Sequence, residues 1–207
     1  MISTAAIEEA LQTYGIADPA SDLADKISAY IDLLLKWNRR ISLTTVTKPS
    51  EIVRFHFGES LFALSQLKFR ESRLADVGSG AGFPGLPLAM ALPALKVTVI
   101  ESNLKKCAFL AEVIRQLSIS NATVAPRRME ELEASAQFDF VTARALGRLP
   151  ELLVWSREHL ATAGRVLLWL GEDDSREVGR SSGWKWEQPI LIPGSKRRYL
   201  LPGSPQR

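Results

Sequence analysis

Apolar side chains recur at every third or fourth position over the first third of the chain. That spacing gathers them on one face of a helix, and it predicts three helices before any strand. The expected helices span about 3–14, Ser21 to Trp37, and about 51–65, with Ser3 or Thr4 capping the first and Ser50 capping the third. We expect residues 1–66 to form a helical extension that packs on the rest of the chain.

Short apolar runs alternate with helical periods from residue 67 onward. The expected strands are Leu74–Val77, Val97–Ile100, Ala122–Ala125, Phe138–Ala143 and Arg165–Leu170, with helices that begin near Gly85, Leu104 and residue 149. Such runs suit a parallel sheet that is buried on both faces. The alternation predicts an α/β protein with a doubly wound, mainly parallel sheet over residues 67–207. An antiparallel pair between Trp184 and Leu201 is expected to close one sheet edge.

Four glycines follow the first expected strand within eight positions, in the segment Asp76-Val77-Gly78-Ser79-Gly80-Ala81-Gly82-Phe83-Pro84-Gly85. Glycine permits the tight turn that brings a backbone against a ligand. A dinucleotide fingerprint, G-x-G-x-x-G, needs its third glycine where this chain has Phe83. The pattern D-x-G-x-G-x-G resembles instead the nucleoside-binding turn of class I S-adenosylmethionine-dependent methyltransferases. The alternative is a glycine-rich surface loop without a ligand.

The candidate site residues stand where expected strands end, because an open parallel sheet binds ligands at the carboxyl ends of its strands. Glu101 and Ser102 follow the second strand, about 20 residues beyond the glycine turn, where a carboxylate accepts hydrogen bonds from ribose hydroxyls. Met129 and Glu130 follow the third strand, beside the expected adenine. Arg144 follows the fourth, where substrate and methyl donor meet. Each of three residues also has an alternative role without a ligand. Glu101 could be a surface acid at a strand end, Glu130 an acid at a helix start, and Arg144 a partner in a surface salt bridge.

The chain lacks the residues that two kinds of methyl transfer generally use. Methylation of an exocyclic amine generally uses an Asn/Asp-Pro-Pro-Tyr turn after the fourth strand, but this chain has Thr-Ala-Arg-Ala at 142–145. Methylation of pyrimidine carbon 5 needs a cysteine nucleophile, and Cys107 lies inside an expected helix as a small buried side chain. The remaining acceptors are a lone pair such as purine N7 or a hydroxyl with a base. His56 is the plausible histidine base.

Composition indicates a folded protein of 207 residues with 46% hydrophobic and 24% charged residues. One cysteine and two histidines make a metal site unexpected. The chain shows neither an apolar run of the roughly 20 residues that cross a membrane nor a signal peptide, so we expect a cytoplasmic protein. The net charge is only +3, but basic residues cluster, which suits a phosphate backbone. The clusters are Lys36 to Arg54, Arg127-Arg128 and Lys196-Arg197-Arg198.

The chain resembles the bacterial small-subunit rRNA guanine-N7 methyltransferases (RsmG, formerly GidB) over about residues 30–171. The matching segments are Trp37-Asn38 through Leu43-Thr44, His56-Phe57 with Glu59-Ser60-Leu61, the glycine turn through Gly85, Glu101-Ser102 with Lys105-Lys106, Arg128-Met129-Glu130 and Thr142-Ala143-Arg144-Ala145. The chain departs from the family at Ser42, where Asn is common, and at Leu170, where Lys is usual.

The resemblance implies a class I methyltransferase (Rossmann-like) fold, S-adenosylmethionine as cofactor, and N7 of one guanosine in the decoding region of 16S rRNA as acceptor. The expected cofactor-binding residues are Gly78, Gly80, Phe83, Glu101, Ser102, Met129, Glu130 and Arg144. We expect Arg144 to position the reactants, without a general base. The candidate RNA contacts are Asn38, Arg39, Arg40, Thr44, His56, Arg197 and Arg198, and the small ribosomal subunit is the expected partner of a monomer. A small-molecule methyltransferase and a non-catalytic nucleotide-binding module remain the alternatives.

Overall fold

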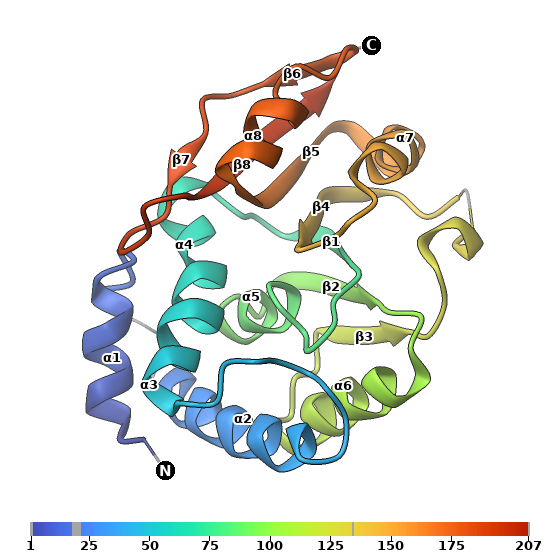
Figure 1. Cartoon of the computed structure of the whole chain (residues 1–207). Helices are drawn as coiled ribbons and strands as arrows, with labels where there is room; N and C mark the ends of the chain where they lie inside the picture. Colours follow the sequence, from blue (N-terminus) through green and yellow to red (C-terminus); the bar gives the residue numbers. More distant parts are fainter. Residues whose placement is uncertain (1, 18–21, 134, 207) are drawn as a thin grey trace.

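The computed structural model describes residues 2–17, 22–133 and 135–206. The N-terminal part is helical, as expected, and continues into an eight-stranded sheet (Figure 1). The helical segments are α1 Thr4–Gln12, α2 Leu23–Asn38, α3 Pro49–Ile52, the π-helix Val53–Gly58, α4 Glu59–Gln66, α5 Gly85–Ala91, α6 Leu104–Gln116, the 3-10 turn Met129–Glu131, α7 Leu149–His159 and α8 Glu172–Val178. The strands are β1 Ser72–Val77, β2 Leu95–Ile100, β3 Ala122–Ala125, β4 Phe138–Arg144, β5 Leu160–Gly171, β6 Trp184–Trp186, β7 Ile190–Leu191 and β8 Arg198–Pro205.

The sheet has the order β3-β2-β1-β4-β5-β8-β6, with β7 also paired to β8. Strands β1 to β5 pair in parallel, whereas β8 pairs antiparallel with β5, β6 and β7. The strand order therefore reverses between β1 and β4, which confirms the doubly wound arrangement and puts the expected ligand crevice at the ends of these two strands. In their register Val77 lies opposite Ala143, so the glycine turn and Arg144 emerge side by side.

Both faces of the sheet are buried by alternating side chains. Leu74, Val97 and Phe140 face the layer formed by α2, α4, α5 and α6, while Val77 and Val141 face the layer of α7 and α8. Figure 1 shows the N-terminal helices α1, α2 and α4 (blue to cyan) on the same side as α5 and α6. The helical extension therefore shares one hydrophobic core with the glycine-turn half of the sheet.

Three expectations about the elements are wrong in detail. The expected helix 51–65 is divided, because a π-helix separates α3 from α4, and Lys48, not Ser50, is the N-cap of α3. The C-terminal tail forms three strands instead of a pair. The expected start of the second helix at Ser21 lies outside the described residues.

The first cap is confirmed, since Ser3 accepts a hydrogen bond from the amide of Ala6. Among the described residues, no helix combines the length and apolar character needed to cross a membrane. The same residues contain no group of three side chains able to hold a metal ion.

Candidate active site

The glycine turn lies at the carboxyl end of β1 and is held by backbone hydrogen bonds. Gly78, Gly80 and Gly82 have φ of 68°, 58° and 88°, in the left-handed region that favours glycine. The amides of Gly78 and Ser79 both donate to the carbonyl of Ile100 at the end of β2, at 2.9 and 3.1 Å. A Cβ at Gly80 would meet only one atom within 4 Å, the carbonyl oxygen of Gly78 at 3.8 Å. The backbone of the turn is therefore fixed by hydrogen bonds to the end of β2, and the space beside Gly80 is open.

Asp76, two residues before the turn, is a buried carboxylate that braces the turn from the core. Its Oδ2 accepts from the amide of Gly85 at 3.1 Å, and its Oδ1 accepts from the hydroxyl of Thr142 on β4 at 2.8 Å. Burial raises the pKa of this carboxyl to about 6, while the same hydrogen bonds act to lower it. Asp76 is 0% exposed, so its role is to join the turn, α5 and β4.

Glu101 faces the turn from the end of β2, as expected for a ribose partner. Its Oε2 accepts from the amide of Gly80 at 3.0 Å, and its Oε1 accepts from the amide of Asn103 at 2.8 Å. Each carboxylate oxygen has a second lone pair, so two hydroxyls of a ligand can also donate to it. Glu101 thus shapes the turn and presents an acceptor to its outer side.

A hollow of about 210 Å³ lies between the turn and the segment after β3. It is lined by Val77, Gly78, Ile100, Glu101, Ser102, Arg127, Arg128, Met129, Glu130, Leu146 and Arg148. The structure therefore brings Gly78, Glu101, Ser102 and the Met129-Glu130 pair to one site. Glu130 forms an ion pair with Arg148 at 2.9 Å across the hollow, and Met129 is buried below it.

These residues fit the adenosine half of S-adenosylmethionine. The hollow has an apolar base for a purine, a carboxylate for ribose hydroxyls, and glycines without side chains that would fill it. Their assignment to individual atoms of the cofactor stays a prediction. The fit also disfavours the surface-loop alternative, because a loop without a ligand needs neither the hollow nor the carboxylate.

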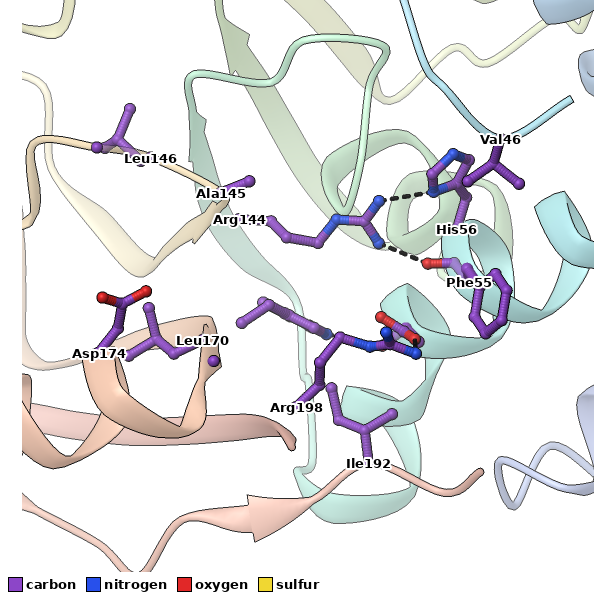
Figure 2. Close-up of a pocket in the computed structure, with 14 residues that line it drawn as sticks. Val46, Phe55, His56, Arg144, Ala145, Leu146, Leu170, Asp174, Ile192 and Arg198 are labelled. Atoms are coloured by element: carbon purple, nitrogen blue, oxygen red, sulfur yellow. Dashed lines mark hydrogen bonds and ion pairs between the residues drawn. The ribbon is translucent and has the colours of Figure 1, made fainter. Parts of the chain in front are cut away.

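Arg144, the last residue of β4, projects into a second and larger cavity of about 740 Å³ (Figure 2). The cavity is lined by Val46, Phe55, His56, Glu59, Arg144, Ala145, Leu146, Gly147, Trp169, Leu170, Gly171, Asp174, Ile192 and Arg198. Leu146 lines both this cavity and the hollow at the glycine turn. The two spaces are therefore neighbours on either side of the loop that follows β4.

Arg144 is fixed by the π-helix of the N-terminal extension. Its Nη1 donates to the carbonyl of Phe55 at 2.9 Å, and its Nη2 donates to Nδ1 of His56 at 2.8 Å (Figure 2). The guanidinium also lies 5.6 Å from the ring centre of Phe83, in the range of a cation–π contact. Phe83 is buried, and its ring contacts the rings of Tyr30 and His56. Phe83 therefore supports Arg144 from beneath, at the edge of the glycine turn.

His56 has both ring nitrogens engaged inside the protein. Because a guanidinium only donates, Nδ1 must be the acceptor, so the Nε2–H donates to the hydroxyl of Thr44 at 2.8 Å. Burial and the positive charge of Arg144 lower the pKa of His56 to about 4. The imidazole is neutral at physiological pH and has no free nitrogen for use as a base.

Asn38 and Thr44 hold the segment between α2 and α3. Oδ1 of Asn38 accepts from the amides of Leu43 and Thr44, and its Nδ2 donates to the carbonyl of Thr44. Asn38, Thr44 and His56 therefore form one internal hydrogen-bonded chain that ends at Arg144. Direct contacts of these three with RNA stay a prediction, since the structure engages them internally.

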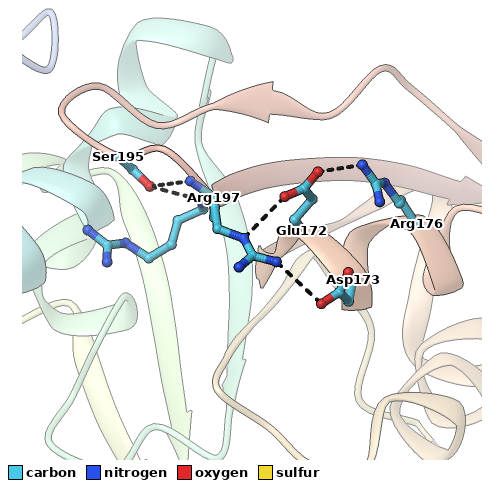
Figure 3. A network of polar contacts seen from close by, with 6 residues as sticks. Glu172, Asp173, Arg176, Ser195 and Arg197 are labelled. Carbon is cyan, nitrogen blue, oxygen red and sulfur yellow. Dashed lines mark hydrogen bonds and ion pairs between the residues drawn. The ribbon is translucent and has the colours of Figure 1, made fainter.

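The basic candidates divide into exposed and paired groups. Arg39 and Arg40 are exposed beside the C-terminus of α2. Arg197 forms ion pairs with Glu172 at 3.2 Å and Asp173 at 3.6 Å, within a network that Figure 3 shows extending to Arg176. The acidic start of α8 therefore adjoins the C-terminal basic cluster, although the sequence placed acid and base in separate regions.

Arg198 and Glu59 face each other in the large cavity. Nη2 of Arg198 lies 2.6 Å from Oε1 of Glu59, and its guanidinium lies 5.1 Å from the ring centre of Phe55. Burial raises the pKa of Glu59, and the charges of Arg198 and Arg144 oppose that rise. Trp169 on β5 donates to the backbone carbonyl of Glu59 at 2.7 Å and fixes the start of α4.

Sequence reasoning missed the roles of Tyr30 and Glu59. Tyr30 was expected only as part of an apolar helix face, but its hydroxyl donates to the carbonyl of Ala81 in the glycine turn at 2.7 Å. Glu59 lies within a matching segment of the family resemblance, yet no spacing in the sequence indicates that it is buried in a cavity. Leu170, which replaces the usual Lys, lines the same cavity.

Known proteins resemble this chain over most of its length. The family model described as rRNA small subunit methyltransferase G (GidB) matches residues 23–183. The protein named ribosomal RNA small subunit methyltransferase G from Stenotrophomonas maltophilia (strain K279a) is 37% identical over 201 residues, which cover 95% of this chain and 92% of that protein.

Two solved structures share the fold at low sequence identity. Ribosomal protein L11 methylase from Lactobacillus delbrueckii subsp. bulgaricus has a TM-score of 0.62 at 14% identity, over 74% of this chain and 80% of that one. The glycopeptide N-methyltransferase MtfA in complex with S-adenosylmethionine has a TM-score of 0.59 at 14% identity, over 72% of this chain and 86% of that one. The sheet is thus that of the class I, Rossmann-like methyltransferases. The match over most of its length places this chain in the rRNA small subunit methyltransferase G family.

Proposed function

We propose that this protein transfers a methyl group from S-adenosylmethionine to N7 of a guanosine in the decoding region of 16S rRNA. The observation that carries the proposal is the adjacency of two spaces across Leu146, one fitted to a nucleoside and the other large and lined by Arg144. Family membership supports S-adenosylmethionine as the donor and small-subunit rRNA as the substrate.

The chemistry of N7 suits a site in which the histidine beside Arg144 is not available as a base. Guanine N7 carries an unprotonated lone pair, so no proton has to leave before attack. S-adenosylmethionine supplies, when bound, an electrophilic methyl group on a sulfonium. His56, the plausible base, has its nitrogens committed to Arg144 and Thr44. A hydroxyl acceptor would need a proton acceptor, and His56 cannot serve as one.

The residues around the cavity position the reactants. Phe55 and His56 hold Arg144 at the end of β4, next to the glycine turn. A cation fixed there can orient the methyl donor and the target base. Phe55 and Trp169 contribute apolar surface that limits water in the cavity. Positioning of this kind supplies up to roughly 7–11 kcal/mol of a barrier in favourable cases.

We also propose how the chain is divided and where it meets RNA. Residues 1–66 form the recognition part and residues 67–207 the methyltransferase domain, although the two share one core. Arg39 and Arg40 are the exposed candidates for phosphate contacts. Arg197 and Arg198 can bind phosphates only if they give up their ion pairs with Glu172 and Glu59. We expect a monomer that acts in the cytoplasm on rRNA or a small-subunit particle.

The test is a methyl-transfer assay with labelled S-adenosylmethionine and purified protein. The acceptors are rRNA and small-subunit particles from cells that lack this protein, with a panel of small-molecule acceptors in parallel. We expect label on RNA, recovered as N7-methylguanosine. Transfer only to small molecules would favour the small-molecule enzyme, and binding of the donor without any transfer would favour the non-catalytic module.

A further inference from the structure

Glu59 is an acid in the large cavity, and its carboxylate has few partners within the protein. It stands at the first position of α4, is 4% exposed, and lines the cavity together with Arg144. Its buried Oε1 contacts Arg198 in an ion pair outside hydrogen-bond geometry. Apart from that pair, the carboxylate accepts no hydrogen bond from any residue in the described ranges. Arg198 compensates the charge at Oε1 but leaves Oε2 without a hydrogen-bond donor in the described part of the chain, and a shielded acceptor gains free energy when a ligand supplies one.

The proposed acceptor has a matching pair of donors. The Watson–Crick edge of guanine presents N1–H and the N2 amine side by side, and two parallel donors match the two oxygens of one carboxylate. Adenine also carries a nucleophilic N7, but its N1 is a lone pair that a carboxylate would repel. Reaction at N7 therefore does not select guanine, and selection requires a group on the opposite edge of the base.

The cavity holds such a group on a different element from Arg144. Arg144 enters the cavity from the end of β4 (Figure 2), and Glu59 belongs to the first turn of α4. Phe55 and Trp169 contribute aromatic side chains to the lining of the cavity. A base with N7 toward the glycine turn thus directs its Watson–Crick edge away from the turn and toward Glu59.

We propose that Glu59 determines guanine specificity by accepting hydrogen bonds from N1–H and the N2 amine of the target base, an assignment that rests on the proposed function. Methylation at N7 places positive charge on the ring and makes N1–H a stronger donor. The hydrogen bonds to Glu59 therefore strengthen as the methyl group is transferred, which is the condition for accelerating the reaction. Asp174 lines the same cavity but is exposed, so water screens it and weakens its discrimination.

The experiment compares single-turnover methyl transfer to small-subunit rRNA that carries guanosine, inosine or adenosine at the target position. Inosine keeps N7 and N1–H but lacks the N2 amine. We expect the wild type to methylate the inosine RNA about tenfold or more slowly than the guanosine RNA, since one hydrogen bond to a charged acceptor is lost. Adenosine RNA should react more slowly still.

Glu59→Gln removes the charge and one acceptor, so its guanosine-to-inosine rate ratio should fall toward one. The matched control is Glu71→Gln, the same chemical change at an exposed residue just before the amino end of β1, and it should keep the wild-type ratio. A Glu59→Gln protein with the wild-type ratio would overturn the assignment, because a merely structural ion pair would leave the ratio unchanged.

The wild-type protein alone also decides the matter if Glu59→Gln fails to fold. Equal rates on guanosine and inosine RNA would show that the N2 amine is not recognised and would refute the role of Glu59 as proposed. Failure to methylate guanosine RNA at all would instead overturn the proposed function itself. The two failures are therefore distinct.

Discussion

The contact between Arg144 and His56 offers the sharpest test of how the site is built. His56→Phe keeps the ring that stacks on Phe83, with centres 4.8 Å apart in the wild type, and removes both nitrogens. Arg144→Met keeps most of the aliphatic stem and removes the guanidinium. The two substitutions and their combination form a double-mutant cycle on the hydrogen bond of 2.8 Å between Arg144 Nη2 and His56 Nδ1.

The magnitude follows from the charge and burial of this pair. A hydrogen bond to a charged group contributes about 1.5–3 kcal/mol, and His56 is only 9% exposed. We therefore expect a coupling free energy of about 2 kcal/mol in urea unfolding. The free energy of unfolding should fall in each single variant because an acceptor of Arg144 or a donor to His56 is lost.

The losses of activity in the same variants should not be additive if Arg144 and His56 act together. Misplacement of a positioning group by about 1 Å costs about 100-fold in rate, so each single variant should lose about that much kcat/KM. The double variant should lose no more than the worse single variant, since residues that act together are strongly non-additive. A double variant in which the two losses multiply would refute the positioning of Arg144 by His56.

Three further predictions follow from the core of the turn. The raised pKa of Asp76 means that the folded state binds more protons than the unfolded state between pH 3.8 and about 6. The stability that this shift contributes is present below pH 4 and is lost as pH rises through 6. From pH 4 to pH 7, the free energy of unfolding of Asp76→Asn minus that of the wild type should therefore rise by up to about 3 kcal/mol in urea unfolding. Tyr30→Phe leaves the carbonyl of Ala81 unpaired and should lower the free energy of unfolding by about 1–3 kcal/mol, with weaker donor binding in calorimetry. Gly82→Ala would place a Cβ 2.3 Å from the Tyr30 hydroxyl at φ +88°, so it should abolish donor binding, while Gly147→Ala, with no atom within 4 Å of its Cβ, should leave thermal stability unchanged.

The strands, and the adjacency of the glycine turn to Glu101, could be predicted from sequence because their signals are local. Each parallel strand is an apolar run bounded by turn residues, so strands β1 to β4 were predicted within a few residues, whereas β5 begins at Leu160, five residues before the expected start. The glycine turn and Glu101 were predicted together because their spacing along the chain reflects adjacent strand ends. These features depend on one or two neighbouring segments.

The large cavity could not be predicted, because residues far apart in the chain form it. Glu59 resembles an ordinary acid in the first turn of a helix until Arg198 and Trp169 are brought beside it. The π-helix Val53–Gly58, which presents Phe55 and His56 to Arg144, leaves the apolar periodicity of the segment intact and so escapes notice. The ion pairs of Arg197 likewise depend on the pairing of β5 with β8.

The most direct test of the central claim is a map of N7-methylguanosine in 16S rRNA from a strain that lacks this protein. We expect one N7-methylguanosine to disappear, to return when the wild-type chain is restored, and to stay absent when Arg144→Met is supplied. An unchanged map in the strain without the protein would contradict the account.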